Sequence, residues 1–118
     1  MAETFSPRER IKKRTDFQRL YADGNRYKGK YFILIYQAGS SDYSRLGVVV
    51  SKKHGNAVHR NRIKRLLRAL FRTNKDLLQS PLDLVLIPKK GIRNAEWTSL
   101  RIDYRRAAEH IQISTVMT

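Results

Sequence analysis

The sequence predicts a single α+β domain in which helices pack on a small mixed sheet. Two observations carry this prediction. A helical segment at about 56–73 lies between two segments rich in β-branched residues, 45–51 and 82–87, which is the pattern of a β-α-β unit. The chain has 118 residues, of which 41% are hydrophobic, enough for one modest core. No internal repeat or low-complexity linker divides it, so 1–118 is expected to be one domain.

Two further helices are predicted, one before and one after this unit. The first begins near Thr15, which has capping-box spacing to Gln18, and ends at Gly24 in a left-handed conformation. A helix of roughly ten residues is marginal in isolation, so it is expected to dock on the sheet. The second helix covers 95–112, with its apolar residues at helical spacing. Its candidate N-caps are Asn94 and Thr98, and Trp97 is expected in the core or in helix packing.

Three strands are predicted from apolar and β-branched runs. The first, 30–37, has apolar residues on both faces, so both faces are expected to be at least partly covered. The second, 45–51, is expected to run antiparallel to the first. The third, 82–87, is expected to be parallel to the second, because a helix connects the two. One face of the first strand carries Tyr31, Ile33 and Ile35. The other carries Phe32, Leu34 and Tyr36, which are expected in the core if the first face is open.

The basic residues are numerous and unevenly distributed. Lys and Arg number 25 against 10 acidic residues, for a formal net charge of +15, and no acid lies between Asp42 and Asp76. The arm at 1–14 is also basic, with Ile11 as its expected anchor, and the tail at 113–118 is expected to fray. This charge indicates a polyanionic partner, with nucleic acid as the first candidate and an anionic membrane surface as the second.

Other classes of site lack their usual sequence signals. The chain has no Cys, which excludes disulfides, Cys-based zinc sites and a cysteine nucleophile. No apolar run approaches the ~20 residues of a membrane span, and no secretory signal is present, so a cytoplasmic protein is expected. The histidines His54, His59 and His110 are scattered, and no metal site is expected from them.

The segment 51–72 combines dense cations with a regular apolar stripe. Asn56 occupies the N-cap position, where its side-chain oxygen can accept a bond from a first-turn N–H. A helical wheel separates the apolar arc from a cationic arc, and no acid is available for pairing. The cations line either a solvated helix surface or a surface for phosphates, and the missing acids favour phosphates. The apolar arc holds Ile63, Leu66, Leu67 and Leu70, with Phe71 at its edge.

The segment 52–72, KKHGNAVHRNRIKRLLRALFR, closely resembles the signature of the bacterial ribonuclease P protein subunit family. The resemblance extends to the Thr15-Asp16-Phe17 helix, the strand at 30–37, the strand that contains Asp83 and the closing helix. It therefore spans nearly the whole chain. The matching residues of the signature are Lys53, Gly55, Asn56-Ala57-Val58, Arg60-Asn61-Arg62, Lys64-Arg65 and Arg68.

The resemblance implies the small subunit of a ribonucleoprotein that removes the 5′ leader from precursor tRNA. In this family the RNA subunit carries the catalysis with magnesium ions, so no catalytic residue and no bound cofactor are expected in the polypeptide. The implied fold is an α-β sandwich with a left-handed β-α-β crossover, against the usual right-handed rule. The implied partners are the catalytic RNA and precursor tRNA.

The resemblance and the charge together indicate a surface for the RNA subunit. Arg60, Arg62, Lys64, Arg65 and Arg68 are implied to contact that RNA or to lie beside the cleavage site. Arginine offers a fork for phosphate oxygens. The full set expected to bind the RNA subunit is Lys52, Lys53, Asn56, Arg60, Asn61, Arg62, Lys64, Arg65, Arg68 and Arg72.

A second surface is implied for the leader, between the first helix and the sheet. Phe17 and Tyr21 either stack on leader bases or pack in the core, since both roles fit their spacing. Family members often have an aromatic residue where this chain has Ile35, so only an apolar wall is expected there. The full set expected to line the leader cleft is Lys12, Lys13, Arg14, Phe17, Tyr21, Tyr31, Ile33 and Ile35.

Three alternatives remain at the level of sequence. A general RNA-binding module would explain the charge, but not the complete signature. A peripheral membrane protein would need an exposed apolar stripe beside the cations. A self-sufficient nuclease would need a metal-ligand cluster or a Ser/His/Asp set, and no such motif is recognised. The basic loop with Lys89, Lys90 and Arg93 is equally compatible with RNA contact and with a solvated turn.

Overall fold

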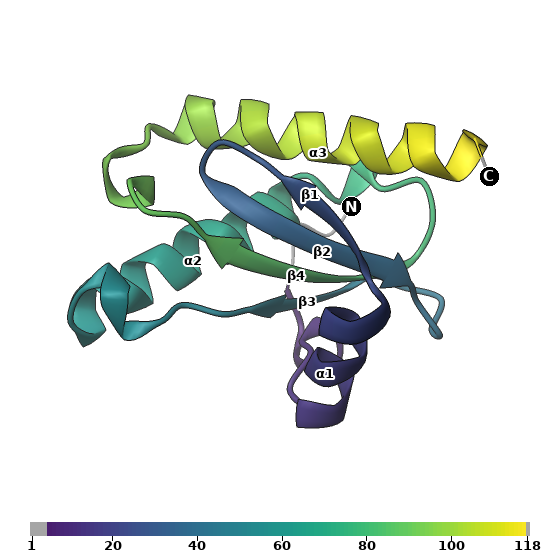
Figure 1. Cartoon of the computed structure of the whole chain (residues 1–118), viewed down its shortest axis with the longest axis horizontal. Coiled ribbons are helices and arrows are strands. Elements are labelled where there is room, and N and C mark those ends of the chain that lie inside the picture. The colour runs from purple at the N-terminus through teal and green to yellow at the C-terminus, as the bar shows by residue number, and fades with distance from the viewer. Residues whose placement is uncertain (1–4, 118) are drawn as a thin grey trace.

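The computed structural model describes residues 5–117, with side chains to residue 113, as a four-stranded sheet with helices on both faces (Figure 1). This confirms the predicted α+β class. Short 3-10 turns η1 (Pro7–Glu9), η2 (Lys52–His54), η3 (Lys75–Leu77) and η4 (Ile92–Asn94) join the main elements. The main elements are α1 (Arg14–Asp23), β1 (Asn25–Lys28), β2 (Phe32–Ala38), β3 (Arg45–Val48), α2 (Ala57–Thr73), β4 (Leu82–Pro88) and α3 (Trp97–Met117).

The strands lie in the order β1-β2-β4-β3. β3 pairs in parallel with β4, and α2 connects them, so the predicted β-α-β unit is confirmed. β2 is antiparallel to both β1 and β4. β3 therefore runs opposite to β2, as predicted, but β4 lies between them. β1 was not predicted, because its sequence NRYK has no apolar alternation and gains its strand conformation by pairing with β2.

The core has one cluster on each face of the sheet. The larger cluster joins Phe32 and Leu34 of β2 to Leu67 of α2 and Tyr104 of α3, all buried, which confirms the predicted core side of β2. Figure 1 shows α3 along one side of the sheet and α1 against the other. Ile11 is only 5% exposed and anchors the N-terminal arm, as expected. The smaller cluster, on the α1 side, consists of Ile11, Leu20, Ile35 and Val85.

The predicted ends of α1 are wrong in detail. The helix begins at Arg14 with Lys13 as its N-cap, so Thr15 lies in the first turn and makes no capping box. Gly24 has a φ of −72°, not a left-handed value. Glycine is needed there for space, because a Cβ would lie 2.5 Å from the Leu20 carbonyl oxygen and 2.8 Å from Cγ2 of Ile35.

The other boundaries also shift. β3 ends at Val48, before the predicted Ser51, and β4 includes Pro88. α3 begins at Trp97, so neither predicted N-cap is used, and it continues to Met117 beyond the predicted end. Trp97 is 37% exposed and lies outside the core clusters. Across the described part of the chain, the helices are too short or too polar to cross a membrane.

Candidate nucleic-acid interface

Gly55 and Asn56 shape the start of α2. Gly55 has a φ of +109°, which favours glycine, and a Cβ there would lie 3.1 Å from Nδ1 of His59. The next residue, Asn56, accepts a hydrogen bond from the His59 backbone N–H at 3.1 Å, which confirms the predicted N-cap. The exposed Lys52 and Lys53 of η2 therefore lie close to the first turn of α2.

The outer side of α2 carries a run of cations. Ile63, Leu67 and Leu70 are at most 1% exposed and fix the opposite side in the core. Within residues 5–113, the ion pairs involve none of the five cations between positions 60 and 68. We call the following set the α2 surface: Lys52, Lys53, Asn56, Asn61, Arg62 and Arg65, which are exposed, and Arg60, Lys64, Arg68 and Arg72, which are half-buried.

The N-terminal arm adds a further cation to the α2 surface. The pKa of Arg68 is lowered, first by burial and then by the positive charge of Arg10. The Arg10 guanidinium lies 4.9 Å from the centre of the Phe5 ring. The Arg10 backbone forms an isolated parallel β-bridge with Leu46 of β3. Two guanidinium groups that repel each other favour an anion between them. Arg10 was not predicted on this surface, although the crowded cations of the arm were the available signal.

The basic loop after β4 divides into two parts. The Lys89 ammonium donates to the Gly29 carbonyl oxygen at 2.5 Å and so ties the loop to the turn before β2. Lys90 and Arg93 are exposed. The Arg93 guanidinium lies 3.3 Å from Nε2 of His59 on α2. Arg93 therefore extends the α2 surface, whereas Lys89 has a structural contact.

On the α1 side of the sheet, side chains from neighbouring strands form three rows. α1 covers the first two rows, which we call the polar row and the buried row. The third, the open row, is only half-buried. The strand register gives the polar row as Gln37–Asp83–Arg45, the buried row as Ile35–Val85–Gly47, and the open row as Ile33–Ile87, extended by Val49 after β3.

Phe17 lies directly on the backbone of Gly47. A Cβ on Gly47 would be 2.6 Å from Cε1 and 2.7 Å from Cζ of the Phe17 ring, so the contact needs glycine. The Phe17 ring stays half-buried next to the open row, and Tyr21, one turn later, is 37% exposed. Aromatic and apolar side chains are thus accessible together on this side. Ile87 and Val49 of the open row were missed by the sequence analysis.

Two residues expected in the leader cleft lie elsewhere. Ile35 is fully buried beneath α1, so it belongs to the core and does not form an open wall. Tyr31 precedes β2 and packs against the larger cluster, away from Phe17 and Ile33. Its backbone N–H donates to the buried Asp103 carboxylate at 2.8 Å. The cations at 12–14 are exposed at the start of α1.

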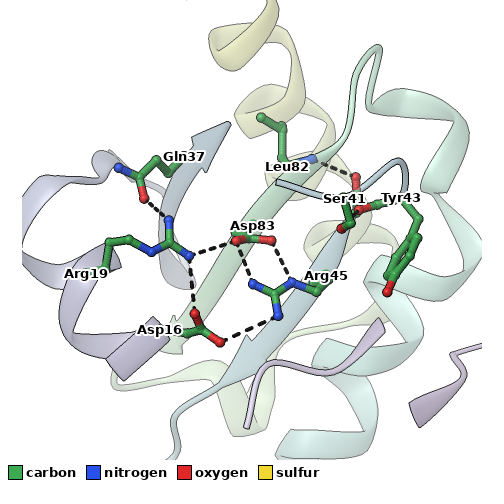
Figure 2. A network of polar contacts seen from close by, with 9 residues as sticks. Asp16, Arg19, Gln37, Ser41, Tyr43, Arg45, Leu82 and Asp83 are labelled. Atoms are coloured by element: carbon green, nitrogen blue, oxygen red, sulfur yellow. Dashed lines mark hydrogen bonds and ion pairs between the residues drawn. The ribbon is translucent and has the colours of Figure 1, made fainter. Parts of the chain in front are cut away.

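A fully buried carboxylate, Asp83, ties α1 to the sheet, as Figure 2 shows. Arg45 donates to it from Nε at 2.9 Å and from Nη2 at 2.8 Å, and Arg19 of α1 donates from Nη2 at 3.0 Å. Asp16 lies 3.5 Å from each of the two guanidinium groups. Arg19 also donates to the Gln37 side-chain oxygen. We call these five residues the Asp83 network, in which two aspartates neutralise two arginines.

The Asp83 network shifts the pKa values of Asp83 and Arg45. Burial acts to raise the pKa of Asp83, but hydrogen bonds from Arg45 and Arg19 and their charges outweigh it, so this pKa lies below its ordinary value. The hydrogen bond to Asp83 raises the pKa of Arg45. An acid inside the apolar strand 82–88 was the sequence signal for such a network, because a buried charge requires partners.

The described residues offer no metal-binding cluster, since no group of three or more His, Asp or Glu side chains could hold an ion. His54 is buried in η2, while His110 lies 5.1 Å, ring to ring, from Tyr27.

The fold and the unpaired cations define a small basic α+β protein of the nucleic-acid-binding class. The chain belongs to the bacterial ribonuclease P protein family: the family model described as Ribonuclease P matches residues 5–112. Among curated relatives, the ribonuclease P protein component of Thermotoga maritima is 41% identical over 92 residues, which cover 78% of this chain and 79% of the relative. That of Syntrophus aciditrophicus is 45% identical over 97 residues, 82% of each chain.

Solved structures show the same similarity. The ribonuclease P protein from Thermotoga maritima superposes with a TM-score of 0.78 at 32% identity, over 86% of this chain and 96% of that one. The protein from Staphylococcus aureus superposes with a TM-score of 0.75 at 33% identity, over 93% of this chain and 98% of that one. These matches confirm the family inferred from the signature at 52–72.

Proposed function

We propose that the α2 surface binds the catalytic RNA of ribonuclease P and that the α1 side of the sheet binds the 5′ leader of precursor tRNA. The protein thereby assists endonucleolytic removal of the leader, while the RNA subunit carries the catalysis with its magnesium ions. The proposed location is the cytoplasm, where precursor tRNA is made.

Binding of the catalytic RNA is supported by the five cations between positions 60 and 68 of α2, which form no ion pair within residues 5–113. Arg62 and Arg65 are exposed and have no carboxylate within reach among the described residues. Each phosphate that such a side chain neutralises releases counterions, which favours binding at low salt. Arginine also binds phosphate oxygens in a bidentate way that lysine cannot reproduce.

The leader role is supported by accessible aromatic and apolar groups beside free cations. Phe17 and the open row are half-buried, and Tyr21 is exposed, so single-stranded bases can stack or pack there. Base stacking on an aromatic side chain is worth ~1–3 kcal/mol. Lys12, Lys13 and Arg14 lie at the start of α1, where they can neutralise leader phosphates.

The membrane alternative is less compatible with the burial of α2. A peripheral membrane helix would need its apolar stripe at the surface. Ile63, Leu67 and Leu70 are instead in the core, each at most 1% exposed. Exposed Val58, at 68%, is a single apolar side chain at the start of α2 and makes no stripe.

The decisive experiment is cleavage of precursor tRNA by a bacterial ribonuclease P RNA at low magnesium, with and without the protein. Stimulation of cleavage at the mature 5′ end is expected. The protein alone should not cleave. Absence of stimulation, under conditions where a known ribonuclease P protein stimulates the same RNA, would contradict the proposal. Equal affinity of the complex for precursor and mature tRNA would instead favour a general RNA-binding module.

A further inference from the structure

The Asp83 network joins three strands and one helix through a single buried carboxylate. Asp83 of β4 is fully buried and accepts three hydrogen bonds from guanidinium groups, two from Arg45 of β3 and one from Arg19 of α1. Charge-assisted bonds of this kind are about twice as strong as neutral ones. Removal of the Asp83 charge would leave Asp16 as the one carboxylate of the Asp83 network to neutralise both Arg19 and Arg45.

α1 depends on this attachment for its position. It has ten residues, few enough to be marginal without tertiary contacts. It contacts the sheet through Leu20, which clusters with the buried row, through the Phe17 ring on Gly47, and through the polar attachment of Arg19 and Asp16. The apolar contacts hold α1 against the sheet, and the directional bonds to Asp83 further restrict where α1 sits.

The Asp83 network also occupies Arg19 and Arg45, so their guanidinium groups are not available to bind phosphates. The Arg19 side chain is 37% exposed, but its guanidinium is directed to Asp83, Asp16 and Gln37. Arg45 is held by Asp83 and Asp16. Arg19 and Arg45 are therefore expected to support leader binding by holding α1 in place, and not by contact with leader phosphates.

We propose that Asp83 is a positioning residue for leader binding, which acts through Arg19 to hold Phe17 and Tyr21 at a fixed place beside the open row. The proposal rests on the leader role assigned to this side of the sheet. Asp83 itself touches no RNA, because it is fully buried. Loss of its charge lets α1 shift, and the surface beside the open row loses its fixed shape while the α2 surface stays intact.

The test compares precursor tRNAs with a long leader and with a single-nucleotide leader, bound to the reconstituted holoenzyme. The leader contribution is the dissociation constant for the single-nucleotide leader divided by the dissociation constant for the long leader. Asp83→Asn should reduce this ratio by about tenfold, equivalent to the loss of roughly one base stack. Its affinity for the catalytic RNA should remain within about twofold of the wild-type value, because the α2 surface is not altered.

Arg19→Gln is the second variant, since it breaks the link to α1 and leaves the Arg45 bonds to Asp83 in place. It should reduce the leader contribution in the same direction and leave the salt dependence of leader binding unchanged. A decrease of the salt slope by about one would instead show a direct phosphate contact and overturn the positioning role. This variant also decides the matter if Asp83→Asn fails to fold.

Glu9→Gln is the matched control. Glu9 is another buried carboxylate, and it pairs with Lys75 at 2.6 Å, outside the Asp83 network. It should leave the leader contribution unchanged. If Glu9→Gln lowers the leader contribution as much as Asp83→Asn does, Asp83 has only a structural role. The same conclusion follows if Asp83→Asn weakens the binding of both precursor tRNAs equally. Absence of any leader contribution in the wild-type protein would refute the leader role itself, whereas a wild-type contribution retained in both variants would refute only the positioning.

Discussion

Gly47→Ala tests the contact that places Phe17 on the sheet. The new Cβ would lie 2.6 Å from the Phe17 ring, so the ring must move by roughly 0.8 Å to restore an ordinary contact. Overpacking of this kind costs about 1–3 kcal/mol, and the smaller entropy of the unfolded alanine chain offsets about 0.4–1 kcal/mol. We therefore expect a loss of about 1–2 kcal/mol in the free energy of unfolding.

Urea denaturation measures this loss as a lower midpoint with an unchanged m-value. Gly39→Ala is the matched control, because its Cβ would meet its nearest atom at 3.4 Å, an ordinary contact. The control should not lose stability and should gain up to about 1 kcal/mol from the smaller entropy of its unfolded chain. In a Phe17→Ala background, Gly47→Ala should lose most of its cost. If the two effects instead add within about 0.3–0.5 kcal/mol, the clash with the ring is not the cause.

Three further outcomes are expected. Arg65→Ala should weaken binding to the catalytic RNA and lower the slope of log affinity against log salt concentration by about one. Arg101→Ala, at an exposed position of α3, should change neither quantity. An unchanged slope for Arg65→Ala would exclude a phosphate contact. Because the pKa of Asp83 is lowered on folding, its stabilisation is complete above the ordinary value of about 3.9 and is lost as the pH falls through the folded-state pKa. Urea titrations of Asp83→Asn should therefore show a weaker decline of stability in acid, and parallel pH curves would contradict this. Asn56→Ala should cost about 1 kcal/mol through the lost cap, while exposed Asn61→Ala in the same helix should cost little; equal losses in thermal unfolding would argue against the cap.

The parts of the fold predicted correctly are those determined by local sequence. The N-cap at Asn56 depends only on the next few residues, and α2 starts where predicted. β1 depends on its pairing with β2, and no pattern within its four residues indicates that. Gly24 was expected for its φ value but is required for its lack of a Cβ, a condition set by the Leu20 carbonyl oxygen one turn earlier and by Ile35 of β2.

The same distinction applies to the candidate sites. The cations of α2 are contiguous in sequence, so a helical wheel could gather them on one side. The rows on the α1 side are set by strand register, which brings Ile87 beside Ile33 and Asp83 beside Arg45. Alternation along β2 alone could not show that α1 covers Ile35 and leaves Ile33 half-buried. Tyr31 left the expected face because it lies before the strand begins, where its backbone binds Asp103.

The placement of the few acids decides what kind of RNA this surface favours. Asp16 and Asp83 neutralise Arg19 and Arg45, so the middle of the α1 side offers aromatic and apolar groups. The exposed cations at 12–14, beside the start of α1, form no ion pair within residues 5–113. A single strand can place bases on the apolar middle and phosphates on these cations. A duplex keeps its bases stacked inside and could use only the cations, so the arrangement favours an unpaired leader over a helical stem.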